Sequence, residues 1–145
     1  MGAAPGEPVP NRPLWLSHHH EDQTDRCALV AGRRVCRRCL WFWPAVAIWC
    51  AAALAGARWS ESADPVLLVL LPVPVVAEWW LEHLGAVRYS PVRQVVLSLL
   101  AAPAVGVGLA RYLESPGDRL FWSVVAAYAV VCAAPVVIRW RRRIP

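Results

Sequence analysis

The sequence predicts an all-α membrane protein, a four-transmembrane-helix bundle that follows a small polar N-terminal cassette. Two observations support this fold class. The chain is 58% hydrophobic and only 17% charged, whereas about 25% of the residues of a soluble domain are charged. Four apolar runs also approach the roughly 20 residues that a helix needs to cross the bilayer core. We therefore expect membrane lipids to surround most of the chain.

The chain begins with two segments that precede the apolar runs. Residues 1–16 are rich in proline and glycine, which predicts a flexible arm. Residues 17–39 are polar and contain three consecutive histidines followed by three cysteines, with Gly32 favouring a turn between the first and second cysteine. These six side chains are His18, His19, His20, Cys27, Cys36 and Cys39.

The four apolar runs define a transmembrane domain and are followed by a basic tail. Pro72 and Pro74 predict a kink in the second run, because proline removes a helical hydrogen bond. Small residues allow helices to approach closely, so Ala52, Gly56, Gly106 and Gly108 are expected to lie against other helices. The predicted helices are 40–59, 65–84, 93–113 and 120–138, within a domain of residues 40–139 that leads to the tail 139–145.

The distribution of arginine predicts the orientation in the membrane. Six arginines precede the first run, two lie between the second and third runs, and four lie in the tail, which puts twelve on one side. The other side has only Arg58, Arg111 and Arg119. Positive residues concentrate on the cytoplasmic side, so both termini are expected in the cytoplasm of a bacterium, with the chain in its inner membrane. Because the basic residues follow this topology, nucleic acid is not an expected partner.

The cassette has the composition of a metal site. Cys36 and Cys39 form a Cys-x-x-Cys pair, whose two sulfurs can reach one tetrahedral ion. Cys27 and one histidine, His18 or His19, would complete a closed set of four ligands, for which zinc is the natural ion. Two alternatives remain open: a redox-active Cys36–Cys39 pair, and a basic juxtamembrane segment whose cysteines are incidental.

These residues also carry a resemblance to a known family. Paired histidines, then Asp-Arg-Cys at 25–27, a glycine, Cys-Arg-Arg-Cys at 36–39 and an aromatic first span together resemble domain-of-unknown-function family 2085, a group of small predicted bacterial and archaeal membrane proteins. The stretch 78–94 is similar to the loop that follows the second span in that family. Paired histidines replace the family's Cys-His, and Cys27 stands where serine is common, so the resemblance leaves the histidine ligand and the role of Cys27 open. It implies no known activity.

An acidic residue lies within the second apolar run. Glu78 is about 13 residues beyond the start of that run and Glu82 is one helical turn further on, on the same face. A carboxylate inside the bilayer is costly, so Glu78 should face protein or water, with Arg93, His83 or an arginine of the Cys-x-x-Cys segment as partner. No second buried charge is expected in the other spans, which weakens the case for a transport path.

The sequence contains no phosphate loop, nucleophile elbow or paired-histidine helix motif, so an enzyme is not the favoured interpretation. We expect a non-enzymatic accessory or assembly subunit of a larger membrane complex, with protein partners in the membrane. Two alternatives come from single features. Cys36 and Cys39 would serve a membrane thiol oxidoreductase, and Glu78 would serve a small ion or metabolite carrier.

Overall fold

A computed structural model describes residues 26–141, with side chains up to residue 138. The described elements are β1 (Cys27–Val30), β2 (Arg33–Cys36), α1 (Arg37–Leu54), the short 3-10 helix η2 (Glu61–Ala63), α2 (Asp64–Leu70), α3 (Val73–His83), α4 (Pro91–Glu114) and α5 (Arg119–Arg141). They belong to two compact units, one ending at Arg37 and one beginning at Arg38.

The described part of the first unit is a β-hairpin. β1 and β2 pair antiparallel, with Cys27 opposite Cys36 and Val30 opposite Arg33. Ala31 and Gly32 connect the strands with φ angles of 48° and 75°, which is typical of the two-residue turns that match the twist of a hairpin. The turn expected at Gly32 is therefore present, but the all-α prediction needs correction because this segment is a two-stranded sheet.

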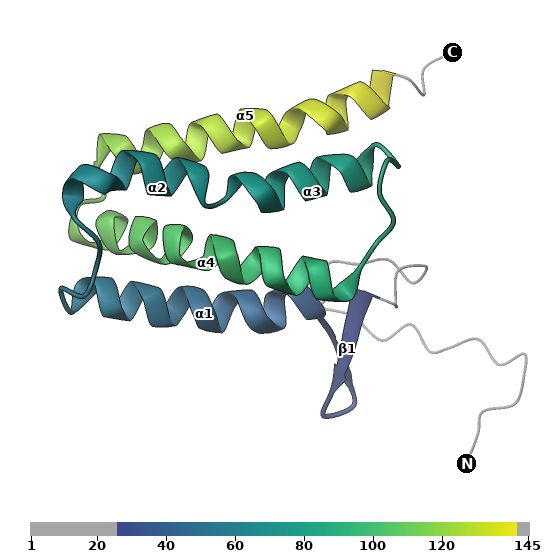
Figure 1. The fold of residues 1–145 in the computed structure, drawn as a ribbon, viewed down its shortest axis with the longest axis horizontal. Helices are drawn as coiled ribbons and strands as arrows, with labels where there is room; N and C mark the ends of the chain where they lie inside the picture. The colour runs from purple at the N-terminus through teal and green to yellow at the C-terminus, as the bar shows by residue number, and fades with distance from the viewer. Residues whose placement is uncertain (1–25, 142–145) are drawn as a thin grey trace, which may run out of the picture. The chain divides into compact units, whose positions relative to one another are not determined.

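The second unit is a bundle of helices, in which α4 lies beside both α1 and the α2–α3 stretch (Figure 1). Three helical stretches are long and apolar enough to cross a membrane: Glu61–His83, Pro91–Glu114 and Arg119–Ile138. α1 is not among them, because its 18 residues begin with Arg37 and Arg38 and include several aromatic side chains of low hydropathy. Of the four predicted spans, the second, third and fourth are thus long and apolar enough to cross a membrane, and the first is not.

α1 differs from its predicted range at both ends. It begins at Arg37, directly after β2, and ends at Leu54 rather than at Trp59. The amide of Gly56 donates to the carbonyl of Ala53 at 3.0 Å, and that of Ala57 donates to Ala52 at 2.9 Å. This is the paired hydrogen-bond pattern that ends many helices, and it needs the positive φ of 86° that Gly56 adopts. Gly56 is therefore a helix terminator, and the prediction that it packs against another helix is wrong.

Gly106 lies where α4 crosses α1. A Cβ atom at this position would lie 2.5 Å from Cβ of Trp49, 2.8 Å from the carbonyl oxygen of Val46 and 2.9 Å from the amide nitrogen of Cys50. Two of these three atoms belong to the backbone of α1, so they cannot move without shifting the helix. The close approach expected at Gly106 is present because glycine alone leaves room for it.

Proline divides the second stretch. α2 ends at Leu70 and α3 begins at Val73, so the break falls beside Pro72, where a kink is expected. A helix break leaves carbonyl groups without their usual amide donors, which is costly where no water is present. Here the hydroxyl of Tyr128, on α5, donates to the carbonyl of Val69 at the break.

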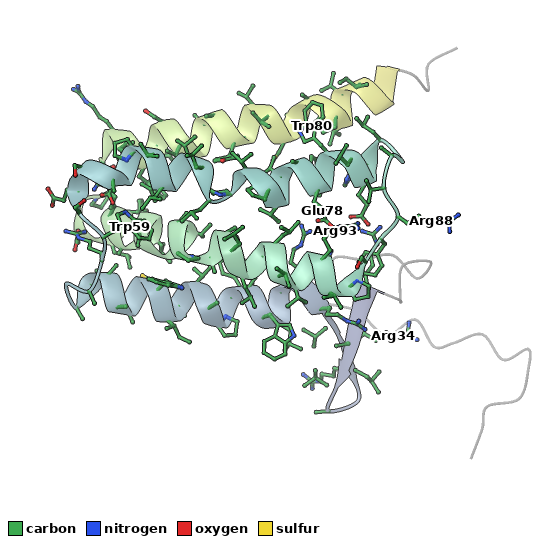
Figure 2. All side chains as sticks on the ribbon, viewed as in Figure 1. Arg34, Trp59, Glu78, Trp80, Arg88 and Arg93 are labelled. Carbon is green, nitrogen blue, oxygen red and sulfur yellow. The ribbon has the colours of Figure 1, made fainter. Side chains whose placement is uncertain are left out.

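A second proline is compensated in the same way. Pro135 has no N–H, so the carbonyl of Val131 four residues earlier lacks its helical donor. The indole Nε1 of Trp80 donates to that carbonyl at 3.0 Å, and Figure 2 shows Trp80 directed from α3 toward α5. Two aromatic side chains thus join α5 to the broken helix at carbonyls that proline or the helix break leaves unpaired.

The first prediction compares two glycines of α4. Gly106→Ala should destabilise the bundle by about 1–3 kcal/mol, because the new methyl group meets backbone atoms. Gly108→Ala is the matched control, since its nearest neighbour would lie at an ordinary 3.7 Å; alanine there should be neutral or stabilising by up to about 1 kcal/mol through helix propensity. Denaturant unfolding in detergent micelles measures both, and equal stabilities would contradict the close crossing.

The second prediction is a double-mutant cycle on the Val131 carbonyl. Trp80→Phe keeps an aromatic ring but removes the donor. It should lower the free energy of unfolding by about 0.6 kcal/mol and at most about 1.7 kcal/mol, the average and the maximum found for hydrogen bonds between membrane helices. In a Pro135→Ala background, the restored amide at position 135 can bind the same carbonyl. The Trp80→Phe cost should then fall, and an equal cost in both backgrounds, measured by thermal unfolding, would show that the indole bond does not replace the missing helical one.

Candidate functional site: two buried carboxylate clusters

The first cluster surrounds Glu78, whose side chain is only 4% exposed. Nη2 of Arg38 donates to its Oε2 at 3.0 Å, and Nε of Arg93 donates to its Oε1 at 3.2 Å. Arg38 and Arg93 lie in the first turns of α1 and α4, and Figure 2 shows Glu78 and Arg93 directed toward each other. Both oxygens of the buried carboxylate are therefore held by guanidinium groups from two different helices.

The partners of Glu78 are themselves held in place. Nη2 of Arg93 donates to the carbonyl of Arg88 at 2.6 Å, and the amide of Arg93 donates to Oγ of Ser90, the residue that caps α4. His83 was a candidate partner, but its Nδ1 lies 3.0 Å from the carbonyl of Trp79, and the centre of its ring lies 4.0 Å from that of the Trp79 ring, with the two planes tilted by 42°. Because a carbonyl only accepts, Nδ1 carries the proton in this contact.

Glu82 lies one helical turn beyond Glu78, as predicted, and is partly buried. Of the groups proposed from sequence around this position, the structure brings together Glu78, Arg93 and one arginine of the Cys-x-x-Cys segment, Arg38. The ion pair expected between Glu78 and an arginine of the cassette is thus present. Its arginine is Arg38, the first residue of the second unit.

The second cluster surrounds Asp64, whose side chain is 1% exposed. Nε1 of Trp59 donates to its Oδ1 at 2.6 Å, and Nη1 of Arg111 donates to its Oδ2. Asp64 is thus a second buried charge, but it lies just before the predicted second span, so it falls outside the expectation that the other spans contain none. Asp64 precedes the second predicted helix, which starts at residue 65, and Arg111 was counted on the less basic side; in the structure, the turn after α1 folds Trp59 over the first residue of α2. An arginine inside an apolar run was the signal that could have revealed this pair.

Arg111 extends the cluster to α5. Its Nη2 donates to Oδ2 of Asp118 at 2.8 Å, and Oδ1 of Asp118 accepts the amide of Phe121 at 2.7 Å, which caps the start of α5. The hydrogen bond from Arg111, followed by that from the Phe121 amide, lowers the pKa of Asp118 below its usual value. Arg58 adds an exposed pair to the same end through Glu114, at 3.0 Å.

The two clusters lie at opposite ends of the bundle, as the positions of Glu78 and Trp59 in Figure 2 show. Arg93 and Arg111 are 18 residues apart on α4, which corresponds to about 27 Å along a helix. That length matches the hydrocarbon core of a bilayer, about 30 Å thick. Each cluster joins α4 to the α2–α3 stretch and to one end of α1, so together they fix the mutual position of these three segments.

The predicted metal ligands are only partly within the described residues. Cys27 and Cys36 face each other on the hairpin, and Cys39 lies in the first turn of α1. His18, His19 and His20 lie outside the described residues. Within residues 26–141, no group of three or more His, Cys, Asp or Glu side chains is arranged to hold a metal ion. Zinc therefore has no support from this part of the chain and stays a prediction.

Comparisons of the chain with protein-family models, with curated proteins and with solved structures found no match. The resemblance of the cassette and of residues 78–94 to domain-of-unknown-function family 2085 is thus still a prediction.

The third prediction tests the Glu78 cluster. Glu78→Gln keeps the shape of the side chain but leaves Arg38 and Arg93 facing each other without a carboxylate. The free energy of unfolding should therefore fall by about 3 kcal/mol. Glu61→Gln is the matched control, because Glu61 is 80% exposed and pairs with Arg58 at 3.7 Å; its effect should stay within about 0.5 kcal/mol. Thermal unfolding in one detergent gives both values, and a Glu78→Gln protein as stable as the control would contradict a structural role.

Proposed function

We propose that this chain is a non-enzymatic accessory or assembly subunit of a larger complex in the bacterial cytoplasmic membrane. The observation that supports it is that all four oxygens of the two buried carboxylates accept a bond from an arginine or tryptophan. A carrier needs a carboxylate that exchanges its ion or proton, and general acid–base catalysis needs one within reach of a substrate. Carboxylates held in this way instead stabilise a fixed arrangement of helices.

Four membrane spans form part of this proposal. Arg38 and Arg93 bind the same carboxylate, so α1 and α4 begin at the same end of the bundle. Trp59, five residues after α1, reaches the cluster that holds Arg111 near the end of α4. α1 thus runs beside α4 from one cluster toward the other, and its 18 residues cover about 27 Å. If α4 crosses the bilayer, α1 must cross it too.

The arginine distribution then orients the protein, with both termini in the cytoplasm. The cassette would lie on that side and bind one structural zinc ion through Cys27, Cys36, Cys39 and either His18 or His19. The register that places Cys27 opposite Cys36 supports two of these ligands, because opposite residues of a hairpin project from the same face. Membrane lipids and membrane proteins are the proposed partners, and nucleic acid is not.

The fourth prediction tests this function in the cell that produces the protein. A chromosomally tagged chain, extracted in mild detergent, should migrate in a complex that contains another membrane polypeptide at fixed stoichiometry. Reporters fused before Ser17 and after Pro145 should both be active in the cytoplasm, and the purified protein should contain one zinc ion per chain.

Each arm has its own contrary outcome. A chain that migrates alone or only with itself would overturn the accessory role. An external reporter at either end would overturn the four-span topology. Absence of zinc would overturn the metal site and would leave the role of the bundle standing.

A further inference from the structure

The hairpin brings two thiols together, and this arrangement suits a reaction other than the binding of zinc. Cys27 and Cys36 are directly opposite in the β1–β2 ladder. Opposite residues of antiparallel strands have Cα atoms about 4.5–5.5 Å apart, and a disulfide requires about 4.4–6.8 Å. The register therefore meets the geometric requirement for a disulfide across the hairpin without any change in the backbone.

The two thiols differ in exposure. Cys36 is 1% exposed, whereas Cys27 is only partly buried. A reagent from solution would therefore meet Cys27 first, and Cys36 would react with the sulfur of Cys27 rather than with the reagent. A partly exposed cysteine beside a second cysteine that resolves its adduct is the usual arrangement of a reversible thiol pair.

Charge near the pair indicates what kind of oxidant would approach it. Arg34, two residues before Cys36 on the same face of β2, is exposed, and Arg33 at the turn is exposed as well. Nη2 of Arg37 donates to the carbonyl of Cys27 at 3.4 Å. Three guanidinium groups around the hairpin would attract an anionic molecule. A small-molecule disulfide that carries carboxylates, such as oxidised glutathione, has this chemistry.

We propose that Cys27 and Cys36 form a reversible dithiol–disulfide pair that reacts with an anionic small-molecule disulfide. The Cys27 thiolate attacks one sulfur of that disulfide, so a mixed disulfide forms and one thiolate leaves, taking up a proton. The Cys36 thiolate then attacks the Cys27 sulfur, forms the Cys27–Cys36 bond and releases the second small thiol. The protein loses two electrons and two protons, which reduce the oxidant to two thiols, and excess small thiol reverses both steps.

This proposal depends on the hairpin alone and not on the accessory role or on zinc. In this proposal Cys36 forms its disulfide with Cys27, whereas the redox pair inferred from sequence would join Cys36 to Cys39. Oxidation would also withdraw two of the four predicted zinc ligands, so zinc and the disulfide would exclude each other at this site.

The test uses the full-length protein in detergent, treated with a chelator and then with oxidised glutathione, after which remaining thiols are alkylated and the chain is cut with trypsin. Cleavage after the arginines at 26, 33, 34, 37, 38, 58, 119 and 139 places Cys27 in peptide 27–33, Cys36 in peptide 35–37, Cys39 together with Cys50 in peptide 39–58, and Cys132 in peptide 120–139. The expected result is the loss of two thiols and a covalent link between peptides 27–33 and 35–37, removed by excess reduced glutathione. The same treatment of urea-unfolded protein is the control, in which links that also involve peptides 39–58 and 120–139 should appear.

Three variants then separate the roles of the cysteines, with helicity of the bundle measured by circular dichroism in each. Cys36→Ser should leave Cys27 carrying one glutathione, Cys27→Ser should leave Cys36 reduced, and Cys39→Ser should leave the link between Cys27 and Cys36 unchanged. A link from Cys36 to peptide 39–58 in the native protein, or no link while helicity is retained, would overturn the proposal.

Discussion

The need to neutralise charge inside an apolar bundle is the constraint on which the rest of the second unit depends. A buried carboxylate or guanidinium that loses its partner destabilises a protein by about 3–5 kcal/mol. α4 carries an arginine near each end, and each binds a carboxylate of the α2–α3 stretch. Sliding α4 by one turn would break both of these ion pairs and would leave Glu78 with Arg38 alone and Asp64 with Trp59 alone, so the two pairs fix the register of α4.

Backbone hydrogen bonding imposes a second constraint, because carbonyls that lose their helical donor at a proline need another donor inside the bundle. Prolines and a broken helix leave carbonyls that lipid cannot satisfy. Tyr128 and Trp80 supply donors for two of these carbonyls and join α5 to the α2–α3 stretch. On the opposite side of α4, Gly106 removes a side chain so that the backbone of α1 can approach. The bundle is therefore held by specific polar contacts and one close crossing, since apolar side chains gain little from leaving lipid for one another.

The two units suit different roles. In the bundle, the buried ionisable groups are engaged by fixed neighbours, which favours a scaffold over a path for ions. The hairpin instead presents two thiols on one face beside exposed arginines, a combination that supports ligand binding or thiol exchange. The proposals for this chain thus assign a scaffold role to the bundle and thiol chemistry to the hairpin.

The sequence by itself determined the apolar runs, the break at Pro72, the turn at Gly32 and the close approach at Gly106, because each depends on local composition or on the shape of a single residue. It also named Arg93 and the cassette arginines as candidate partners of Glu78. Only the tertiary structure selected Arg38 and Arg93 among them, since residues 40 and 15 positions from Glu78 become neighbours through helix packing. The Asp64–Arg111 pair, 47 positions apart, escaped sequence reasoning for the same reason. The pairing of Cys27 with Cys36 likewise came from strand register, because a cysteine spacing does not say which cysteines face each other.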